Sequence, residues 1–238
     1  MRQSKGGIAF PPLTAGRLIR RYKRFLADVE LENKTVVTAH CPNTGAMTAC
    51  SEPGRTVYLS THDHPGRKLK YTWELIDMPA SLVGVNTQIP NRLVYQAIAD
   101  GEIHDFRDYN EIQREVRVGE RRRLDLLVSK NGRDPCYIEI KNCSLVENGV
   151  ARFPDAVTVR GREHLTALQE LSARGFRAVM FFLVNRMDAE LFTPADAIDP
   201  EYGSALRRAA AKGIDILVYD VRIDLAKIRI RKPVPLQL

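Results

Sequence analysis

Three ionisable side chains interrupt two apolar runs of the chain. The runs read Leu124-Asp125-Leu126-Leu127-Val128 and Tyr137-Ile138-Glu139-Ile140-Lys141. Both have the composition of β-strands. Side chains two apart in a strand share a face, so Glu139 and Lys141 point one way while Ile138 and Ile140 point to a core. Charged groups inside otherwise buried strands are candidates for chemistry.

The segment between the two runs contains the turn residues Asn131-Gly132-Arg133-Asp134-Pro135, which predicts a hairpin. If the loop is only Asn131-Gly132, Asp125 lies opposite Ile138. If the loop extends to Pro135, Asp125 lies opposite Lys141. Either register brings Asp125 within about two positions of Glu139.

Two converging carboxylates repel each other unless a positive charge lies between them. Asp125 and Glu139 are therefore candidate ligands for a hard divalent cation, Mg²⁺ or Mn²⁺. Lys141 could orient a water or stabilise the charge that develops on a phosphate. The alternative is a structural salt-bridge network of the same three residues. An isolated Glu-x-Lys favours the network, whereas the burial pattern, the hairpin and the basic charge of the chain favour a site.

The chain is basic, with 36 Lys and Arg against 29 Asp and Glu, a net charge of +7. The excess lies in the first 80 residues, which hold 12 basic and 7 acidic side chains. Its densest part contains the candidate nucleic-acid-binding residues Arg17, Arg20, Arg21, Tyr22, Lys23 and Arg24. Cations interleaved with aromatic rings suit phosphate contacts and base stacking. A solvated face of a strand or helix is the alternative.

Two further groups of residues are candidates for contact with phosphate. Arg160 and His164 are four apart and share a face of an expected helix, so both could reach a phosphate beside the metal. They could equally be a capping residue and a surface histidine. Asn43, Thr44 and Gly45 suit a tight turn whose amides could bind an anion, and a purely structural turn is the alternative.

The distribution of strand and helix signals predicts two domains. Short β-prone runs divided by turn residues fill the chain to about residue 82, which is typical of a small β-barrel such as the oligonucleotide-binding (OB) barrel. Residues 83–238 show α/β texture. The expected helices there are 91–99, 160–174 and 202–212, and the expected strands are 123–128, 136–141, 178–184 and 214–219. Residues 232–235 resemble a tail.

The composition excludes several protein classes. The longest strongly apolar run, Ala178 to Val184, is far shorter than the roughly 18 residues that a membrane-spanning helix needs. The N-terminus lacks the apolar stretch of a secretory signal. The four cysteines have no Cys-x-x-Cys spacing, which favours free thiols over a disulfide framework or a zinc site. We therefore expect a cytoplasmic protein.

The order of these motifs resembles a known family. Asp125 followed by Glu139-Ile140-Lys141 is similar to the PD-(D/E)XK signature of restriction-endonuclease-like nucleases, and Glu115 could match the acidic residue that often precedes the Asp. A longer series resembles the sugar fermentation stimulation protein family over nearly the whole chain. Its blocks are His40-Cys41-Pro42-Asn43-Thr44-Gly45-Ala46-Met47, Arg123-Leu124-Asp125, Glu139-Ile140-Lys141-Asn142-Cys143, Phe153-Pro154-Asp155-Ala156, Arg160-Gly161 and His164.

The resemblance implies an OB-like barrel followed by a restriction-endonuclease-like α/β domain. It further implies DNA binding without sequence preference and a link to sugar metabolism, notably that of maltose. From these observations we expect a DNA-binding protein with a metal-dependent phosphodiesterase site at Asp125, Glu139 and Lys141, with Glu115 as a further member. A non-catalytic DNA-binding regulator and an RNA-binding module remain the alternatives.

Overall fold

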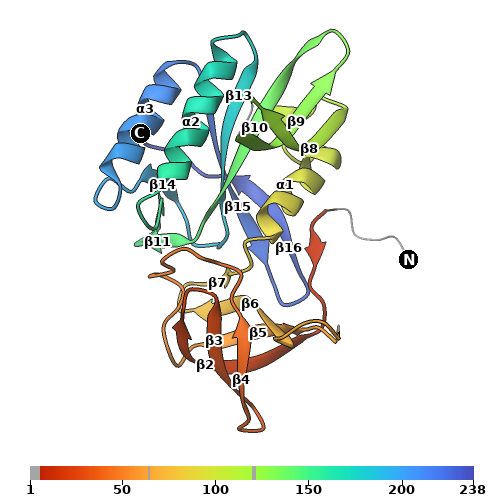
Figure 1. Cartoon of the computed structure of the whole chain (residues 1–238), viewed down its shortest axis with the longest axis vertical. Coiled ribbons are helices and arrows are strands. Elements are labelled where there is room, and N and C mark those ends of the chain that lie inside the picture. Colours follow the sequence, from red (N-terminus) through yellow and green to blue (C-terminus); the bar gives the residue numbers. More distant parts are fainter. Residues whose placement is uncertain (1–5, 64, 120–121) are drawn as a thin grey trace.

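The computed structural model describes residues 6–63, 65–119 and 122–238. In this part of the chain, five N-terminal strands form a closed barrel (Figure 1). They are β2 (Leu13–Tyr22), β3 (Leu26–Leu31), β4 (Val36–His40), β5 (Thr56–Thr61) and β6 (Tyr71–Met78). The strand order is β4-β3-β2-β5-β6, and a short parallel pairing of β4 with β6 closes the barrel. Its core includes Leu18, Val29 and Trp73. The predicted barrel is confirmed.

A mixed sheet forms the centre of the second domain. Its seven described strands have the order β1-β16-β15-β13-β10-β9-β8. They are β1 (Ile8–Ala9), β8 (Glu111–Val118), β9 (Arg122–Lys130), β10 (Arg133–Cys143), β13 (Arg177–Val184), β15 (Asp215–Ile223) and β16 (Lys227–Pro233). A small second sheet contains β11 (Leu145–Glu147), β12 (Val150–Phe153) and β14 (Leu191–Pro194). β10, β13 and β15 run parallel, whereas β8, β9 and β10 form an antiparallel meander.

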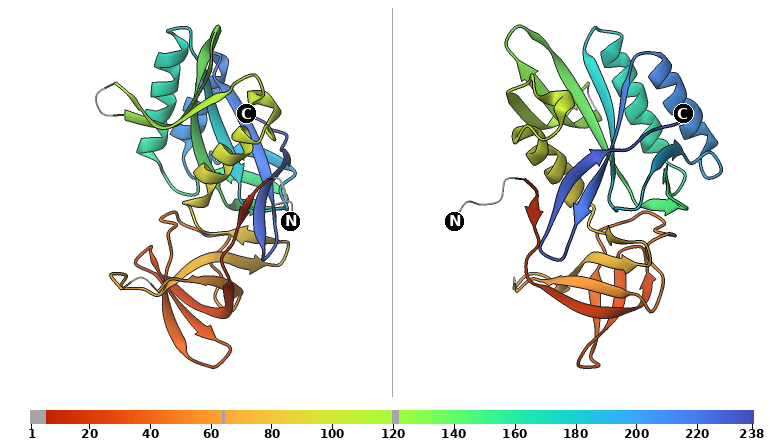
Figure 2. Two further views of the ribbon diagram at one scale, coloured as in Figure 1. Left: turned by 90° about the vertical axis from the view of Figure 1, so that its right-hand side faces the viewer. Right: turned by 180° about the vertical axis from the view of Figure 1, so that it is seen from behind.

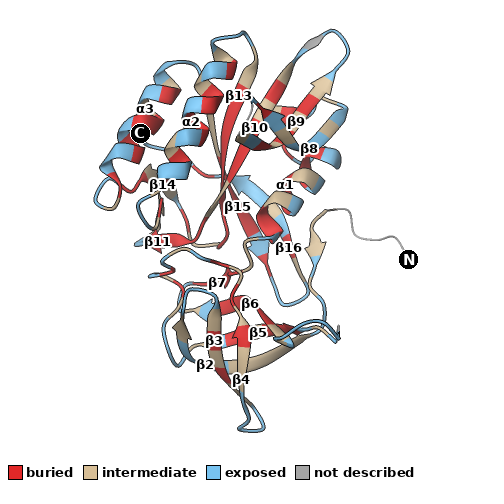
Figure 3. Cartoon of the chain, viewed as in Figure 1, coloured by how far each residue is buried: buried red, intermediate tan, exposed pale blue. Residues whose placement is uncertain are grey.

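Helices cover both faces of this sheet. α2 (Val159–Ser172) and α3 (Pro200–Ala211) pack on one face, and α1 (Ile89–Ala99) packs on the other. Along β13, Met180 and Phe182 contact the α2 and α3 side, while Val179 and Phe181 contact the α1 side. β13 is buried on both faces of the sheet, which explains why its residues from Ala178 to Val184 form an unbroken apolar run (Figure 3).

The expected α/β domain is confirmed, with a 3₁₀ turn (His104–Phe106) added after α1. The expected boundary near residue 82 falls within β7 (Ser81–Gly84), which extends the barrel beside β6. The prediction of a tail at residues 232–235 is wrong, because β16 includes Pro233 and Val234 is buried in the core. Among the described residues, no helix is long and apolar enough to cross a membrane.

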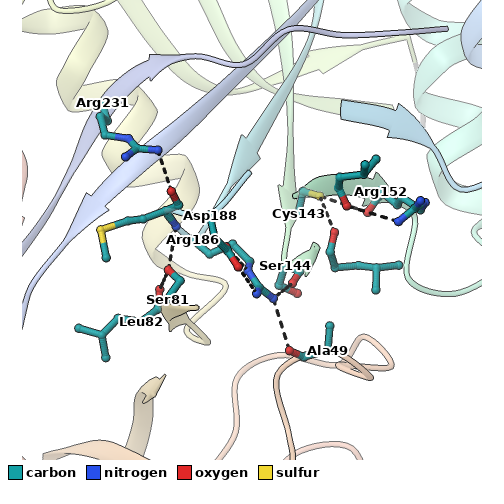
Figure 4. A network of polar contacts seen from close by, with 12 residues as sticks. Ala49, Ser81, Leu82, Cys143, Ser144, Arg152, Arg186, Asp188 and Arg231 are labelled. Carbon is teal, nitrogen blue, oxygen red and sulfur yellow. Dashed lines mark hydrogen bonds and ion pairs between the residues drawn. The ribbon is translucent and has the colours of Figure 1, made fainter. Parts of the chain in front are cut away.

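The two domains meet through backbone contacts around Arg186. The Gly84 amide donates to the Asn185 carbonyl over 2.8 Å, and a Cβ at Gly84 would lie 2.6 Å from the Asn185 side-chain nitrogen. Arg186 is buried and donates to the carbonyls of Ala49 and Ser144, which belong to different domains (Figure 4). The chain also crosses the junction directly after β1, because β1 precedes the barrel in sequence but pairs with β16 in the second domain (Figure 2).

Candidate active site

Three carboxylates lie side by side on neighbouring strands. The β8–β9 register pairs Arg114 with Leu126 and Val116 with Leu124, which brings Glu115 to the level of Asp125. In the β9–β10 ladder, Ile138 pairs with Leu126, so the next position brings Glu139 to the level of Asp125. We call Glu115, Asp125 and Glu139 the carboxylate row.

Both hairpin registers expected from the sequence are wrong. The turn is short, with Lys130 paired to Arg133, but the register then shifts between Arg133 and Cys136. A bulge therefore adds one residue to β10, and Asp125 comes level with Glu139 rather than with Ile138 or Lys141. The expected proximity of the two carboxylates is retained.

Asp125 is held by one group from the neighbouring strand β10 and one from helix α1. Its Oδ2 accepts a hydrogen bond from the Ile140 amide over 2.7 Å, and its Oδ1 accepts one from Asn91 on α1 over 2.7 Å. Burial and the nearby charge of Glu139 raise the pKa of Asp125 to about 6, against the opposing effect of these hydrogen bonds and of Lys141. Burial is the larger of the two causes, and the charge of Glu139 adds to it.

Glu139 is buried and is bound by two basic side chains. Its Oε1 accepts a hydrogen bond from the Lys141 ammonium over 2.6 Å and also contacts Nδ1 of His164. Burial alone would raise the pKa of Glu139, but the His164 hydrogen bond and the charge of Lys141 outweigh it and lower the pKa below its usual value. The second oxygen, Oε2, is buried and finds no hydrogen-bond partner among the described residues. Glu139 thus has an ionised carboxylate with one unused oxygen.

Helix α2 brings two further candidate residues to the row. The helix begins after Thr158, whose hydroxyl accepts a hydrogen bond from the Gly161 amide over 3.0 Å. From this start, Arg160 and His164 lie on the same face, with the Arg160 Nε 3.4 Å from the His164 Nε2. Nδ1 of the same ring lies 2.9 Å from the Lys141 ammonium. The expected sharing of one helical face is observed.

A cavity of about 400 Å³ opens over the row. It is lined by Glu115, Arg122, Arg123, Leu124, Asp125, Glu139, Arg160, Glu163 and His164. Lys141 does not line the cavity, but it contacts Glu139 and His164, which do. The cavity therefore combines oxygen donors on its floor with guanidinium groups on its rim, an arrangement suited to a phosphodiester held beside a cation.

The donor set fits a hard divalent cation. The carboxylate row offers only oxygen ligands, and the unused Oε2 of Glu139 gives one of them a free acceptor. In the described part of the chain, however, no three His, Cys, Asp or Glu side chains already converge on one point. Asp125 is turned to Asn91 and Ile140, and Glu139 to Lys141 and His164. Binding a cation would require these side chains to exchange partners.

The basic N-terminal segment contains cations bound to partners within the barrel and cations at a hairpin tip. Arg21 donates to the carbonyls of Arg24, Asn43, Gly45 and Ala46, and Arg17 donates to the Gly54 carbonyl. Arg20 is paired with Asp28 at 2.8 Å and lies over the ring of Tyr22. Lys23 and Arg24 are exposed and form the β2–β3 turn, where both have positive φ. Arg17 and Arg20 are exposed as well, but each is bound to a partner within the barrel, whereas Lys23 and Arg24 lie at a hairpin tip next to Phe25.

The Asn43-Thr44-Gly45 turn lies against the second domain. Oδ1 of Asn43 accepts a hydrogen bond from the Gly45 amide over 2.9 Å. The amide of Met47, two residues after Gly45, donates to the carboxylate of Asp155 over 3.1 Å. The anion at this turn is therefore a side chain of the same protein.

Four contributors to the site are not among the site residues predicted from the sequence. Asn91 lies at the start of α1, far from the motif, and no local pattern indicates its contact with Asp125. Arg122 and Glu163 line the cavity through tertiary packing. Arg123 could have been found, because it is two residues before Asp125 in a strand and must share its face. It pairs with Glu115 at 3.1 Å.

Comparisons with known proteins agree with this architecture. A family model described as the sugar fermentation stimulation protein RE domain matches residues 88–227, and one described as the SfsA N-terminal OB domain matches residues 19–85. A sugar fermentation stimulation protein homolog of Acidithiobacillus ferrooxidans is 51% identical over 227 residues, covering 95% of this chain and 98% of the relative. A homolog of Geotalea daltonii is 50% identical over 228 residues, covering 96% and 98%.

A solved structure is similar over the same extent. The structure of Pyrococcus furiosus SfsA in complex with Ca²⁺ superposes with a TM-score of 0.89 at 25% sequence identity. The alignment covers 98% of this chain and 99% of the other. The barrel, the α/β domain and their order are therefore shared.

Proposed function

Because the chain belongs to the sugar fermentation stimulation protein family, we propose that it binds DNA without sequence preference and cleaves phosphodiester bonds at the carboxylate row with Mg²⁺ or Mn²⁺. One observation carries the proposal. Glu115, Asp125 and Glu139 lie level on three strands, below a cavity whose rim holds Arg123 and Arg160. The similar Pyrococcus furiosus protein was solved with Ca²⁺, a hard cation with the same preference for oxygen ligands, which supports a cation in this family.

Each residue of the site would have a separate task. Asp125 and Glu139 would hold the cation, with Glu115 at the end of the row. The cation would neutralise phosphate charge and supply a bound water of lowered pKa. Arg123 and Arg160 on the cavity rim would hold the phosphate oxygens. Lys141 and His164 keep Glu139 ionised, as its lowered pKa indicates.

A non-catalytic, DNA-binding regulator of sugar metabolism is the second candidate, and one observation favours it. Without a cation, both carboxylates already have partners. Asp125 accepts hydrogen bonds from Asn91 and Ile140, and Glu139 is bound by Lys141 and His164. This network could serve stability alone. For either function we place the protein in the cytoplasm, where its four buried cysteine thiols would stay reduced.

The protein should cleave DNA with Mg²⁺ or Mn²⁺ and be inactive with chelator. The measurement is incubation with supercoiled plasmid, single-stranded DNA and RNA, followed by electrophoresis. Glu139→Ala and Lys141→Ala should abolish cleavage. Glu111→Gln is the matched control, because Glu111 lies on β8 four residues from Glu115 and pairs with Ser129. If wild type and both alanine variants bind DNA but are equally inert, the protein is a non-catalytic regulator. Cleavage of RNA but not of DNA would show that the substrate is RNA.

Binding should weaken steeply with salt and vary little with sequence, because phosphate contacts release counterions. Reversing both charges at the hairpin tip, Lys23→Glu with Arg24→Glu, should reduce the slope of log affinity against log salt by about 2. Arg21 is unsuitable for this test because it holds four carbonyls of the barrel. The measurement is fluorescence anisotropy on two oligonucleotides of unrelated sequence.

The control for this double variant makes the same change of charge at the C-terminal end of α3, with Arg208→Glu in the last turn and Lys212→Glu at the residue that follows the helix. Equal losses from both double variants would show that only net charge matters. An unchanged affinity of the hairpin variant would show that the tip is a solvated surface.

A further inference from the structure

A second and larger cavity lies where the barrel meets the α/β domain. Its volume is about 670 Å³, within the range of small-molecule sites. It is lined by Ile8, Ala9, Phe10, Pro11, His40, Pro42, His62, Arg67, Thr72, Glu74, Asn86, Gln88, Ile89 and Arg92. We call it the junction cavity. It shares no lining residue with the cavity over the carboxylate row.

Cationic side chains enter the junction cavity from both domains. Arg67 comes from the β5–β6 loop of the barrel, and Arg92 comes from the first turn of α1. In the part of the chain that the structure describes, neither forms an ion pair, although Arg67 donates to the Thr72 hydroxyl over 2.5 Å. His40 lies close enough to Arg67 that burial first, and this charge second, lower the pKa of His40. Two arginines without carboxylate partners beside one cavity are suited to bind a phosphate.

A buried carboxylate forms part of the cavity wall. Glu74 is 5% exposed, and its two oxygens accept hydrogen bonds from Ser60 over 2.6 Å and from Asn86 over 2.8 Å. The Ser60 hydroxyl also lies 3.0 Å from Nε2 of His62. Each carboxylate oxygen can accept a further hydrogen bond, so this network has capacity for N–H donors of a ligand.

Part of the remaining wall of the junction cavity is apolar. Phe10 is fixed there because its amide donates to the Ala226 carbonyl over 2.9 Å, directly after β1 pairs with β16. Ile89, at the start of α1, is buried in the core of the second domain. An aromatic ring and aliphatic side chains suit the flat face of a nucleobase.

We propose that the junction cavity binds a nucleoside phosphate. Its phosphate lies on Arg67 and Arg92, its base lies against Phe10 and Ile89, and N–H groups of the base donate to Glu74. The three features correspond to the three parts of this ligand class: two arginines that form no ion pair with any described residue, an apolar wall and a buried acceptor. The ligand is either a free nucleotide or one nucleotide of a bound strand.

If the ligand is one nucleotide of a bound strand, this strand would connect the junction cavity to the carboxylate row. Arg92 and Asn91 are consecutive residues of α1. Arg92 lines the junction cavity, while Asn91 donates to Asp125 over 2.7 Å. A strand held at Arg92 would therefore be anchored by the same helical turn that orients a carboxylate of the row.

The test is titration calorimetry of the full chain with the four deoxynucleoside monophosphates, with inorganic phosphate and with a six-nucleotide single strand. At least one nucleotide should bind more tightly than inorganic phosphate. Arg92→Ala and Arg67→Ala should each weaken that binding about tenfold or more, the usual effect of losing a charge-assisted hydrogen bond. Arg92 is exposed, so its truncation should leave the fold intact. Arg207→Ala is the control and should leave nucleotide binding unchanged, because Arg207 lines neither cavity and pairs with Asp196 on the exposed surface.

The outcomes separate the two sources and the two sites. If Arg92→Ala weakens the oligonucleotide as much as the nucleotide, the ligand is part of a strand, and an unaffected oligonucleotide identifies a free nucleotide. The proposal is overturned if neither arginine affects any of these ligands, or if inorganic phosphate binds as tightly as the nucleotides. Cleavage at the carboxylate row is measured separately, so its failure would leave this result standing.

Discussion

Replacing Asp125 by asparagine should abolish metal-dependent cleavage and, at the same time, stabilise the fold above about pH 6. The loss of rate should be at least about a thousandfold, because the substitution removes a charged ligand whose cation contributes several kcal/mol to the transition state. The side chains are nearly isosteric. The asparagine introduced there can still accept from the Ile140 amide, and Asn91 can turn its amide to accept from the new NH₂ group.

The gain in stability follows from the raised pKa of Asp125, which lies at about 6 against an ordinary value of 3.8. Between these values the folded state binds the proton and the unfolded state does not. The free energy of unfolding therefore falls as the pH rises through this window and stays lower above it. The difference corresponds to about 2–3 kcal/mol at neutral pH. Asparagine has no charge to lose, so the variant should lack this penalty.

The measurement is urea unfolding of wild type and Asp125→Asn in chelator, at pH 4.5 and at pH 7.5. The variant should be more stable at pH 7.5, and the difference should shrink at pH 4.5. Adding Mg²⁺ or Mn²⁺ should stabilise wild type and not the variant, because a ligand that binds only the folded state raises its stability.

Asp28→Asn is a control of opposite sign. Asp28 accepts hydrogen bonds from Arg20, Thr38 and Tyr22. Burial raises the pKa of Asp28, but these bonds outweigh burial and lower it, so asparagine there should destabilise the protein. A less stable Asp125→Asn at pH 7.5 would show that the row is a satisfied structural network, and retained cleavage would show that Asp125 is not a ligand.

The sequence predicted which residues meet at the site better than how they meet. Strand alternation placed Glu139 and Lys141 on one face, and the structure joins them at 2.6 Å. The register depended on a bulge between Arg133 and Cys136, which has no unique signature because Pro135 fits either a longer loop or a bulge. Local patterns therefore predict which side chains share a face of a strand, while one inserted residue decides which position of the neighbouring strand lies opposite each of them.

Tertiary contacts also decide the tasks of charged residues. The sequence of the basic segment does not distinguish Arg21 from Arg24, but Arg21 is held by four backbone carbonyls and Arg24 lies exposed in the turn. Asn91 is a similar case, since its contact with Asp125 spans 34 positions of the chain. Charge and spacing predict a class of partner, and only the packing shows which side chains remain available to it.

Replacing Arg186 by alanine should lower the free energy of unfolding by about 3 kcal/mol or more. Arg186 is 5% exposed and forms a two-pronged ion pair with Asp188, at 2.7 Å and 2.6 Å. It also donates to the carbonyls of Ala49 in the barrel and Ser144 in the second domain. Truncation would leave Asp188 without its counter-charge and two carbonyls without their donor, and the loss of one partner from a buried ion pair costs about 3–5 kcal/mol.

Arg207→Ala is the matched control, because Arg207 forms an equally two-pronged pair with Asp196, at 2.8 Å and 2.6 Å, on the exposed surface. Exposed pairs contribute about 0–1 kcal/mol, so this variant should unfold almost like wild type. Trp73, the single tryptophan, is buried in the barrel core and reports on the barrel through its fluorescence, while circular dichroism reports on the whole chain.

In wild type the two signals should change together in urea, because Arg186 links the barrel to the α/β domain. In Arg186→Ala the fluorescence transition should move to lower urea than the circular dichroism transition, since the barrel loses the contact of Ala49 with Arg186, whereas the second domain keeps its own larger cores. Arg186→Ala with Asp188→Ala should recover part of the stability but not the coupling, because it removes the stranded charge without restoring the bond to Ala49. Coincident transitions in the single variant, or an effect no larger than that of Arg207→Ala, would contradict the role of Arg186 as the link between the domains.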